Sequence, residues 1–126
     1  MSTILIVEDN EKNMKLVRDI LGHKGYTTLE AVTGGEGVRL ALEHKPDLIL
    51  MDIQLPDIDG ITALMRIRED SALDAVPVVA VSASVMPEDQ HKIVTSGFDA
   101  YITKPISLKP FMATVERFIQ GGRGGA

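Results

Sequence analysis

The sequence predicts an α/β fold, a single doubly wound five-stranded parallel sheet with five helices. Five short apolar runs alternate with segments whose apolar residues recur at helical spacing. Most of these runs are nearly continuous in aliphatic residues, which is typical of strands buried on both faces beneath helices. The connections between the runs are long enough to carry a helix, and crossovers of that kind make neighbouring strands parallel.

The predicted strands are residues 3–7, 26–31, 48–52, 78–82 and 100–103. Residues 26–31 are more mixed in polarity than the others, which predicts an edge position in the sheet. The chain is organised around the third strand, in which four large aliphatic residues lead into Asp52 between Pro46 and Pro56. An acid at the carboxyl end of such a strand either takes part in chemistry or ligand binding or is a turn-forming residue.

Helix limits follow from caps and breakers. Thr33, Asp59 and Ser107 can cap the second, third and fifth helices. The fourth helix, residues 87–96, has a thin apolar face and should be loosely held. The predicted inward residues are Met14, Val17, Ile20 and Leu21 in the first helix, then Val38, Ala41, Leu42, Ile61, Leu64, Ile67, Ile93 and Val94, and finally Leu108, Phe111, Met112, Val115, Phe118 and Ile119.

Length and charge limit the possible functions. Residues 1–120 of the 126 are predicted to form one domain, and the glycine-rich residues 121–126 a flexible tail. The net charge of −5 disfavours nucleic acid or an anionic membrane as a direct partner and favours a protein. The chain has no cysteine for a disulfide or thiolate site. Its apolar stretches are too short for a signal core or a membrane span, so we expect a soluble, cytoplasmic protein.

Polar groups lie at the carboxyl ends of four of the predicted strands, at one edge of the sheet. They are Glu8 with Asp9, Asp52, Ser82 and Lys104. Each has an ordinary explanation alone, as a helix-start acid, turn residue, loop hydroxyl or surface cation. Together, the three carboxylates would repel one another unless a cation lies among them, and hard oxygen ligands without His or Cys favour Mg²⁺. A carboxylate beside Mg²⁺ and a lysine is suited to attack phosphorus and form an acyl phosphate.

Four motifs in register resemble the receiver domain of the two-component response regulators, over residues 3–119. Asp52 lies 30 residues before Ser82 and Ser82 lies 22 before Lys104, as in that family. The motifs are Val7-Glu8-Asp9-Asn10, Met51-Asp52-Ile53-Gln54-Leu55-Pro56-Asp57-Ile58-Asp59-Gly60, Val81-Ser82-Ala83 and Tyr101-Ile102-Thr103-Lys104-Pro105. The stretch after Val7 is most similar to single-domain cell-cycle regulators of the DivK type and to receivers of hybrid histidine kinases.

The resemblance implies a role for each matching residue. Asp52 is similar to the phosphoacceptor, Lys104 to the lysine that contacts the phosphoryl group, and Ser82 and Tyr101 to the switch pair. Glu8, Asp9, Asp52 and the backbone carbonyl of Gln54 match the Mg²⁺ ligands. The side chains of Gln54 and Ser84 match positions that control the lifetime of the phosphoryl group. Pro105 matches a proline that follows a cis peptide bond.

The resemblance also implies a strand order of 2-1-3-4-5, as in flavodoxin-like folds, and a phosphorelay function. The expected protein is a single-domain response regulator that takes a phosphoryl group from a histidine kinase or a histidine phosphotransferase. It would then switch a surface that binds a downstream protein. Such a module is not an enzyme in the ordinary sense, because it catalyses only its own phosphorylation and dephosphorylation.

Two other classes share parts of this pattern. A flavin-mononucleotide binder of the same fold should have a phosphate loop after its first strand, where Glu8 and Asp9 would repel phosphate. A phosphatase of the haloacid dehalogenase type would have an Asp-x-Asp motif at the end of such a strand. In this chain Gln54 stands where the second acid of that motif should be. The run Gly34-Gly35-Glu36-Gly37 lacks the Gly-Lys-Ser/Thr of a P-loop and is predicted to be a turn. The scattered His23, His44 and His91 are predicted to be surface residues.

Overall fold

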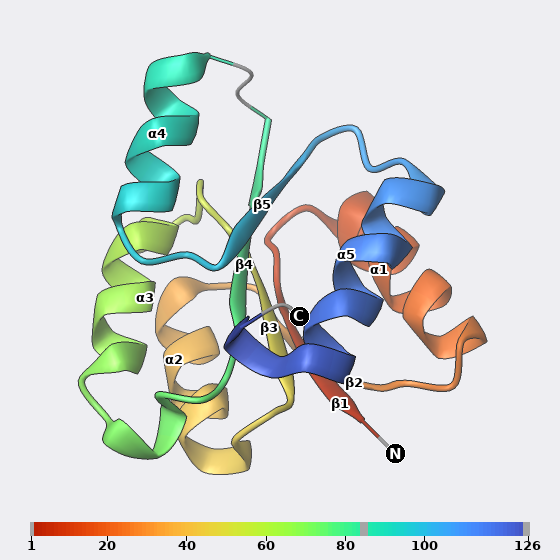
Figure 1. The fold of residues 1–126 in the computed structure, drawn as a ribbon, viewed down its shortest axis with the longest axis horizontal. Helices are drawn as coiled ribbons and strands as arrows, with labels where there is room; N and C mark the ends of the chain where they lie inside the picture. Colours follow the sequence, from red (N-terminus) through yellow and green to blue (C-terminus); the bar gives the residue numbers. More distant parts are fainter. Residues whose placement is uncertain (1, 84–85, 125–126) are drawn as a thin grey trace.

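Five strands alternate with five α-helices in the computed structural model, which describes residues 2–83 and 86–124 (Figure 1). The strands are β1 (Thr3–Val7), β2 (Thr27–Ala31), β3 (Leu48–Asp52), β4 (Val78–Ser82) and β5 (Ala100–Thr103). The helices are α1 (Glu11–His23), α2 (Gly34–His44), α3 (Gly60–Arg68), α4 (Pro87–Thr95) and α5 (Leu108–Gly121). Two short 3₁₀ turns, η1 (Ser71–Leu73) and η2 (Gly122–Gly124), were not predicted.

The sheet is parallel throughout, with strand order β2-β1-β3-β4-β5. This confirms the doubly wound sheet and the order that the resemblance implies, and it places the mixed strand β2 at an edge. Val7 pairs with Met51, Asp52 with Val81, and Ser82 with Thr103. The strands therefore end nearly level, which brings the residues that follow them to one edge of the sheet.

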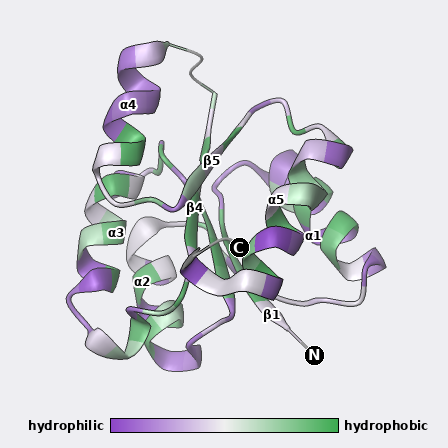
Figure 2. Ribbon diagram, in the orientation of Figure 1, coloured by the Kyte–Doolittle hydropathy of each residue, from purple (hydrophilic) through white to green (hydrophobic). Residues whose placement is uncertain are grey.

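Helices cover both faces of the sheet, with α1 and α5 on one face and α2, α3 and α4 on the other (Figure 1). Successive strand side chains point to opposite faces, so Ile4 and Ile6 pack with α1 and α5, whereas Leu5 and Val7 pack on the other side. Hydrophobic residues gather accordingly along the central strands (Figure 2). Each large aliphatic side chain buried there contributes about 1.5–3 kcal/mol.

Capping side chains fix the starts of the helices beside the sheet. Thr33 Oγ1 accepts a hydrogen bond from the Glu36 N–H at 3.1 Å, and Asp59 Oδ1 accepts one from the Thr62 N–H at 2.7 Å, as predicted. The prediction for Ser107 is wrong in part. It occupies the N-cap position of α5, but in the described part of the chain its hydroxyl makes no capping hydrogen bond. Pro110 lies three residues later, so one of the usual N–H donors to a cap does not exist.

Three residues predicted to face inward are exposed instead. Leu42, Val94 and Leu108 are 38%, 52% and 58% exposed. Leu42 and Val94 directly follow the buried Ala41 and Ile93, and one residue further along a helix turns the side chain by about a quarter-turn or more, off the buried stripe. Leu108 is the first residue of its helix. Ile93 is then the buried residue of α4 among those described, so the thin apolar face is confirmed.

Within the segment predicted to be a flexible tail, residues 121–124 have regular structure. Gly121 still belongs to α5, and Gly122–Gly124 form η2. The Arg123 guanidinium donates from Nε to Asp99 Oδ1 at 3.0 Å and from Nη1 to the Asp74 carbonyl at 3.0 Å. These contacts are between residues 24 and 49 positions apart, so no local pattern in the glycine-rich segment indicates them.

Candidate functional site

The polar groups predicted at one edge of the sheet do lie together. Asp9, Asp52, Ser82 and Lys104 line the same cleft, of about 670 Å³, at the carboxyl ends of β1, β3, β4 and β5. The cleft also contains residues that sequence reasoning did not assign to it, namely Asn10, Asn13, Ile53, Leu55, Pro56, Asp59, Ile61, Ala83, Asp89, Lys92 and Ile93. The parallel topology thus delivers all four of these chemical groups to one hollow.

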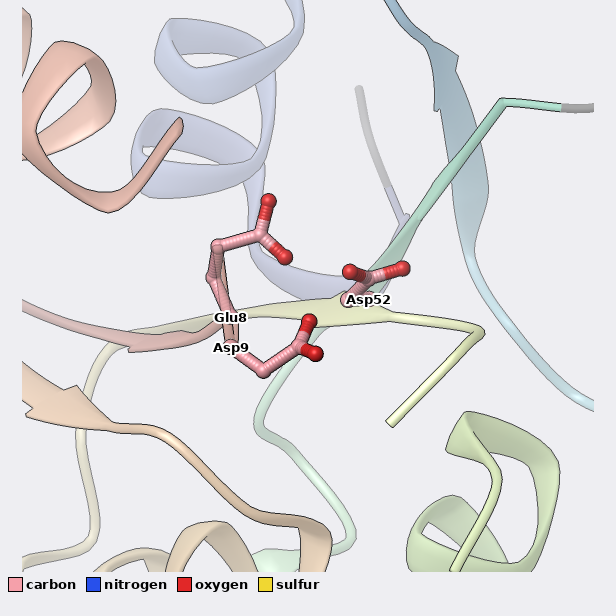
Figure 3. A group of neighbouring side chains, drawn as sticks. All are labelled: Glu8, Asp9 and Asp52. Carbon is pink, nitrogen blue, oxygen red and sulfur yellow. The ribbon is translucent and has the colours of Figure 1, made fainter. Parts of the chain in front are cut away.

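Three carboxylates form the acidic part of the site. Glu8, Asp9 and Asp52 each offer an oxygen, and these oxygens all lie within 4.8 Å of one another (Figure 3). Glu8 and Asp52 are buried, whereas Asp9 is exposed. Carboxylates this close repel one another strongly in a partly buried setting, because little water remains to screen their charges. The cluster therefore requires a cation or a proton.

Lys104 supplies positive charge between two of these acids. Its Nζ lies 2.8 Å from Glu8 Oε1 and 3.0 Å from Asp52 Oδ2. Burial lowers the pKa of Lys104, but hydrogen bonds to Glu8 and Asp52 outweigh that effect and raise it above its ordinary value. The lysine is therefore a fixed cation whose head group points at Asp52. The Lys104–Pro105 peptide bond is cis, as the resemblance implies.

In the described part of the structure, one carboxylate oxygen of Glu8, Oε2, is buried without a hydrogen-bond partner that would stabilise its charge. Burial raises the pKa of the Glu8 carboxyl from 4.5 to about 7, and the neighbouring Asp52 adds to the increase. A buried acceptor without a partner is costly, so this oxygen favours a ligand with positive charge or a proton.

The Asp52 carboxylate is held at both oxygens. Oδ1 accepts a hydrogen bond from the Gln54 N–H at 3.1 Å, and Oδ2 accepts one from Lys104. The adjacent backbone is tightly packed, because a Cβ atom on Gly60 would lie 2.5 Å from the Asp52 carbonyl oxygen. The carboxylate orientation is thus set by the loop that follows it and by Lys104, the residue directly after β5.

The two residues predicted to act as a switch lie on neighbouring strands. Ser82 is buried at the end of β4 and lines the cleft. Tyr101 is in β5, opposite Ala80, and is 37% exposed. Its hydroxyl donates a hydrogen bond to Gln90 Oε1 of α4 at 3.1 Å, a contact that was not predicted. Ser84, predicted to control phosphoryl lifetime, lies outside the described residues.

The glycine-rich run and the histidines lie outside the acidic cluster. Gly34-Gly35-Glu36-Gly37 forms the first turn of α2 and not a separate turn. Its first two N–H groups bind the Asp57 carboxylate, a contact that the sequence did not reveal. His23, His44 and His91 are exposed on three different helices, as expected of surface residues. Among the helices of the described residues, none has the length and apolar character needed to span a membrane.

A parallel sheet of this order, with an acidic cluster and a lysine at its carboxyl edge, defines the class of phosphoacceptor receiver domains. The family model described as the response regulator receiver domain matches residues 4–116. The chain therefore belongs to the response regulator receiver family. A receiver domain is a phosphoacceptor signalling module rather than a true enzyme, and membership implies a histidine kinase as partner.

Named relatives agree with this assignment. The chain is 45% identical to the polar-differentiation response regulator DivK of Brucella anthropi over 93% of this chain and 95% of that protein. The receiver domain of the sensor histidine kinase PA1611 from Pseudomonas aeruginosa has a TM-score of 0.89 at 31% identity, covering 95% of this chain and 98% of that one. That structure is described as having a magnesium ion coordinated in its active-site cleft.

A second solved relative is the receiver domain of a histidine kinase from Syntrophus aciditrophicus. Its TM-score is 0.88 at 30% identity, over 96% of this chain and 92% of that one. The expected likeness both to DivK-type regulators and to the receivers of histidine kinases is thus confirmed.

Proposed function

We propose that Asp52 accepts a phosphoryl group from the phosphohistidine of a kinase or a histidine phosphotransferase, and that the modified protein then binds a downstream protein. The observation that carries this proposal is the position of Asp52. It is buried at the sheet edge, in a cleft, with oxygens of two other acids nearby and the Lys104 Nζ at 3.0 Å. We place this reaction in the cytoplasm, as the sequence predicts from apolar stretches too short for a signal core or a membrane span.

The residues present fit a magnesium ion. Asp9, Asp52, Glu8 and the backbone carbonyl of Gln54 would supply hard oxygen ligands, and the unpartnered Glu8 Oε2 fits a cation close by. The Mg²⁺ reported in the PA1611 receiver supports the same choice of ion. When bound, Mg²⁺ supplies the positive charge that lets a phosphoryl group approach a cluster of carboxylates.

The chain's own residues account for the transfer. An Asp52 carboxylate oxygen attacks phosphorus, so a new P–O bond forms as the P–N bond to the donor histidine breaks. The released imidazole nitrogen keeps the electron pair of that bond and takes up a proton. Lys104, already aimed at Asp52, would neutralise charge on the phosphoryl oxygens. The product is an acyl phosphate on Asp52.

Two further pairs of residues act after transfer. The Ser82 hydroxyl, buried in the cleft, would move toward a phosphoryl oxygen, and Tyr101 would turn in response and change the surface near α4. The side chains of Gln54 and Ser84 would set the access of water and hence the lifetime of the acyl phosphate. The net charge of −5 supports a protein rather than DNA as the output partner.

Replacing the nucleophile tests this function. The phosphoryl donor is either a kinase that carries a radiolabelled phosphoryl group on its histidine or radiolabelled acetyl phosphate. With Mg²⁺ present, either donor should give the wild-type chain an acid-stable, hydroxylamine-sensitive label. The Asp52→Asn variant should carry none, because an amide is a far poorer nucleophile than a carboxylate. Asp70→Asn, which changes an acid at the start of η1, serves as the matched control and should still be labelled. A persistent label on Asp52→Asn would show that another residue is the acceptor.

A further inference from the structure

The loop of residues 53–59, between β3 and α3, is tied to a helix far away in the sequence. Asp57 Oδ1 accepts a hydrogen bond from the Gly34 N–H at 2.8 Å, and Oδ2 accepts one from the Gly35 N–H at 2.9 Å. Both donors are in the first turn of α2, where N–H groups have no partner within the helix. The helix's own cap, Thr33, bonds to Glu36 instead, so the two caps share the first turn between them.

Glycines allow the loop to lie this close to α2. A Cβ atom on Gly34 would lie 2.5 Å from Ile58 Cγ1 and 3.2 Å from the Ile58 carbonyl oxygen. One on Gly35 would lie 3.1 Å from Asp57 Oδ2. A side chain at Gly34 would thus force the loop away from the helix. The glycine-rich run resembles a P-loop only in composition. It is the surface against which the β3–α3 loop packs.

The same loop is closed at its other end, beside the proposed nucleophile. The Gly60 N–H donates to the Ile53 carbonyl at 2.8 Å, and the Gly60 Cα packs against the Asp52 backbone so closely that a Cβ atom would clash. Gln54 lies between this closure and Asp57, and its N–H donates to Asp52 Oδ1. The position of the Gln54 backbone therefore depends on anchors on both sides.

We propose that Asp57 is a positioning residue for the phosphoryl-acceptor site, because it fixes the β3–α3 loop on α2 and so sets where the Gln54 carbonyl and the Asp52 carboxylate lie. This inference rests on the proposed function. Both Asp57 oxygens are engaged by α2, so the residue acts through the loop and not as a ligand itself. Without it, the loop loses the two charge-assisted hydrogen bonds that hold its middle, and the carbonyl and carboxylate sample wider geometries.

The affinity for Mg²⁺ alone, measured by NMR titration or calorimetry, distinguishes a positioning role of Asp57 from an effect on the stability of the whole fold. Asp57→Ala should raise the Mg²⁺ dissociation constant by about tenfold, as for other residues that orient metal ligands. Asp57→Asn keeps one acceptor oxygen and should lie between Asp57→Ala and the wild type. The control is Asp70→Ala, which removes another aspartate cap, the one that accepts from the Ala72 N–H at 2.9 Å. It should bind Mg²⁺ within about twofold of the wild type.

Labelling by acetyl phosphate at rising Mg²⁺ concentration gives a second readout. The rate for Asp57→Ala should approach that of the wild type at saturating Mg²⁺, because the nucleophile and Lys104 are intact. Equal Mg²⁺ affinity in Asp57→Ala and the wild type would overturn the inference, as would an equal loss in Asp70→Ala. A wild-type chain that neither binds Mg²⁺ nor accepts phosphate would instead overturn the proposed function. If Asp57→Ala does not fold, Asp57→Asn decides by the same comparison.

Discussion

The surroundings of Glu8 and Asp57 shift the pKa values of these two carboxyl groups in opposite directions. Burial raises the pKa of Glu8 to about 7, because the charged form loses water. Hydrogen bonds from the backbone N–H groups of Gly35, Ile58 and Gly34 lower the pKa of Asp57 from 3.8 to about 2, because they favour the charged form. The first carboxyl group is thus poised to take a cation or a proton, and the second is an anion at neutral pH that anchors a loop.

The Asp57 anchor predicts a specific dependence of stability on pH. The pKa of this group is lower in the folded chain than in the unfolded one, so its stabilising effect is complete above pH 3.8 and is lost as the pH falls toward about 2. Asp57→Asn has no charge to lose. We therefore expect the urea midpoint of the wild type to exceed that of Asp57→Asn at pH 5, with a smaller difference at pH 2.5. A difference between the two proteins that does not shrink over this range would contradict the assignment.

Among the helices, α4 is the least firmly attached to the core in the described structure. Ile93 is its buried residue, and Val94, predicted to share that role, is exposed. A helix with so few buried contacts can shift at low cost. The hydrogen bond from the Tyr101 hydroxyl to Gln90 connects this helix to β5, so the aromatic residue of the proposed switch and α4 are directly linked.

This link predicts that Gln90 biases the switch. A hydrogen bond of this type contributes about 0.5–1.5 kcal/mol, enough to change a two-state population several-fold. Gln90→Leu removes the acceptor at similar size, so Tyr101 should turn from its partly exposed position more often. The NMR shifts of Tyr101 and α4 in the variant should move toward those of the beryllofluoride-treated wild type, beryllofluoride being a phosphoryl mimic.

His91→Leu, which changes an exposed neighbour on the same helix, is the control and should leave the Tyr101 signals in place. Unchanged Tyr101 signals in Gln90→Leu would show that this hydrogen bond does not hold the ring. If beryllofluoride shifts only the loop around Asp52 in the wild type, the switch itself is absent.

The elements differ in how well their patterns predict them. The strands are predicted almost to the residue, because four of the five are short apolar runs that end at a polar residue. The helices are predicted in extent but less well in their faces, since Leu42 and Leu108 fit the apolar spacing yet are exposed. Spacing fixes a stripe only to within about one residue, and the contact made by the sheet decides which edge of the stripe is buried.

In the whole molecule, long-range contacts are what sequence reasoning misses. The carboxyl-edge residues Asp52, Ser82 and Lys104 are predictable because parallel topology brings strand ends together. The contact of Asp57 with α2 and that of Arg123 with Asp99 join segments more than 20 residues apart, and neither follows a periodic pattern. The resemblance to the receiver family supplies roles for residues but not these contacts.

Asp99 shows how such contacts secure the ends of the fold. Its carboxylate, 9% exposed, accepts hydrogen bonds from the Val78 N–H at 2.9 Å, from Arg68 Nη2 at 3.3 Å and from Arg123 Nε at 3.0 Å. Burial lowers the pKa of Arg68, and Asp99 opposes that change. The start of β4, the end of α3 and the C-terminal turn are thus joined on one carboxylate, outside the cleft that contains Asp52.

Chemical trapping can identify the residue that becomes an acyl phosphate, which we expect to be Asp52. The wild-type chain is treated with acetyl phosphate and Mg²⁺, reduced with sodium borohydride, and digested for peptide mass spectrometry. Borohydride converts an aspartyl phosphate to homoserine, so we expect homoserine at position 52, dependent on both the donor and Mg²⁺. Homoserine at Asp9 or Asp57 instead, or phosphate retained on a serine, threonine or histidine, would show that Asp52 is not the phosphoacceptor.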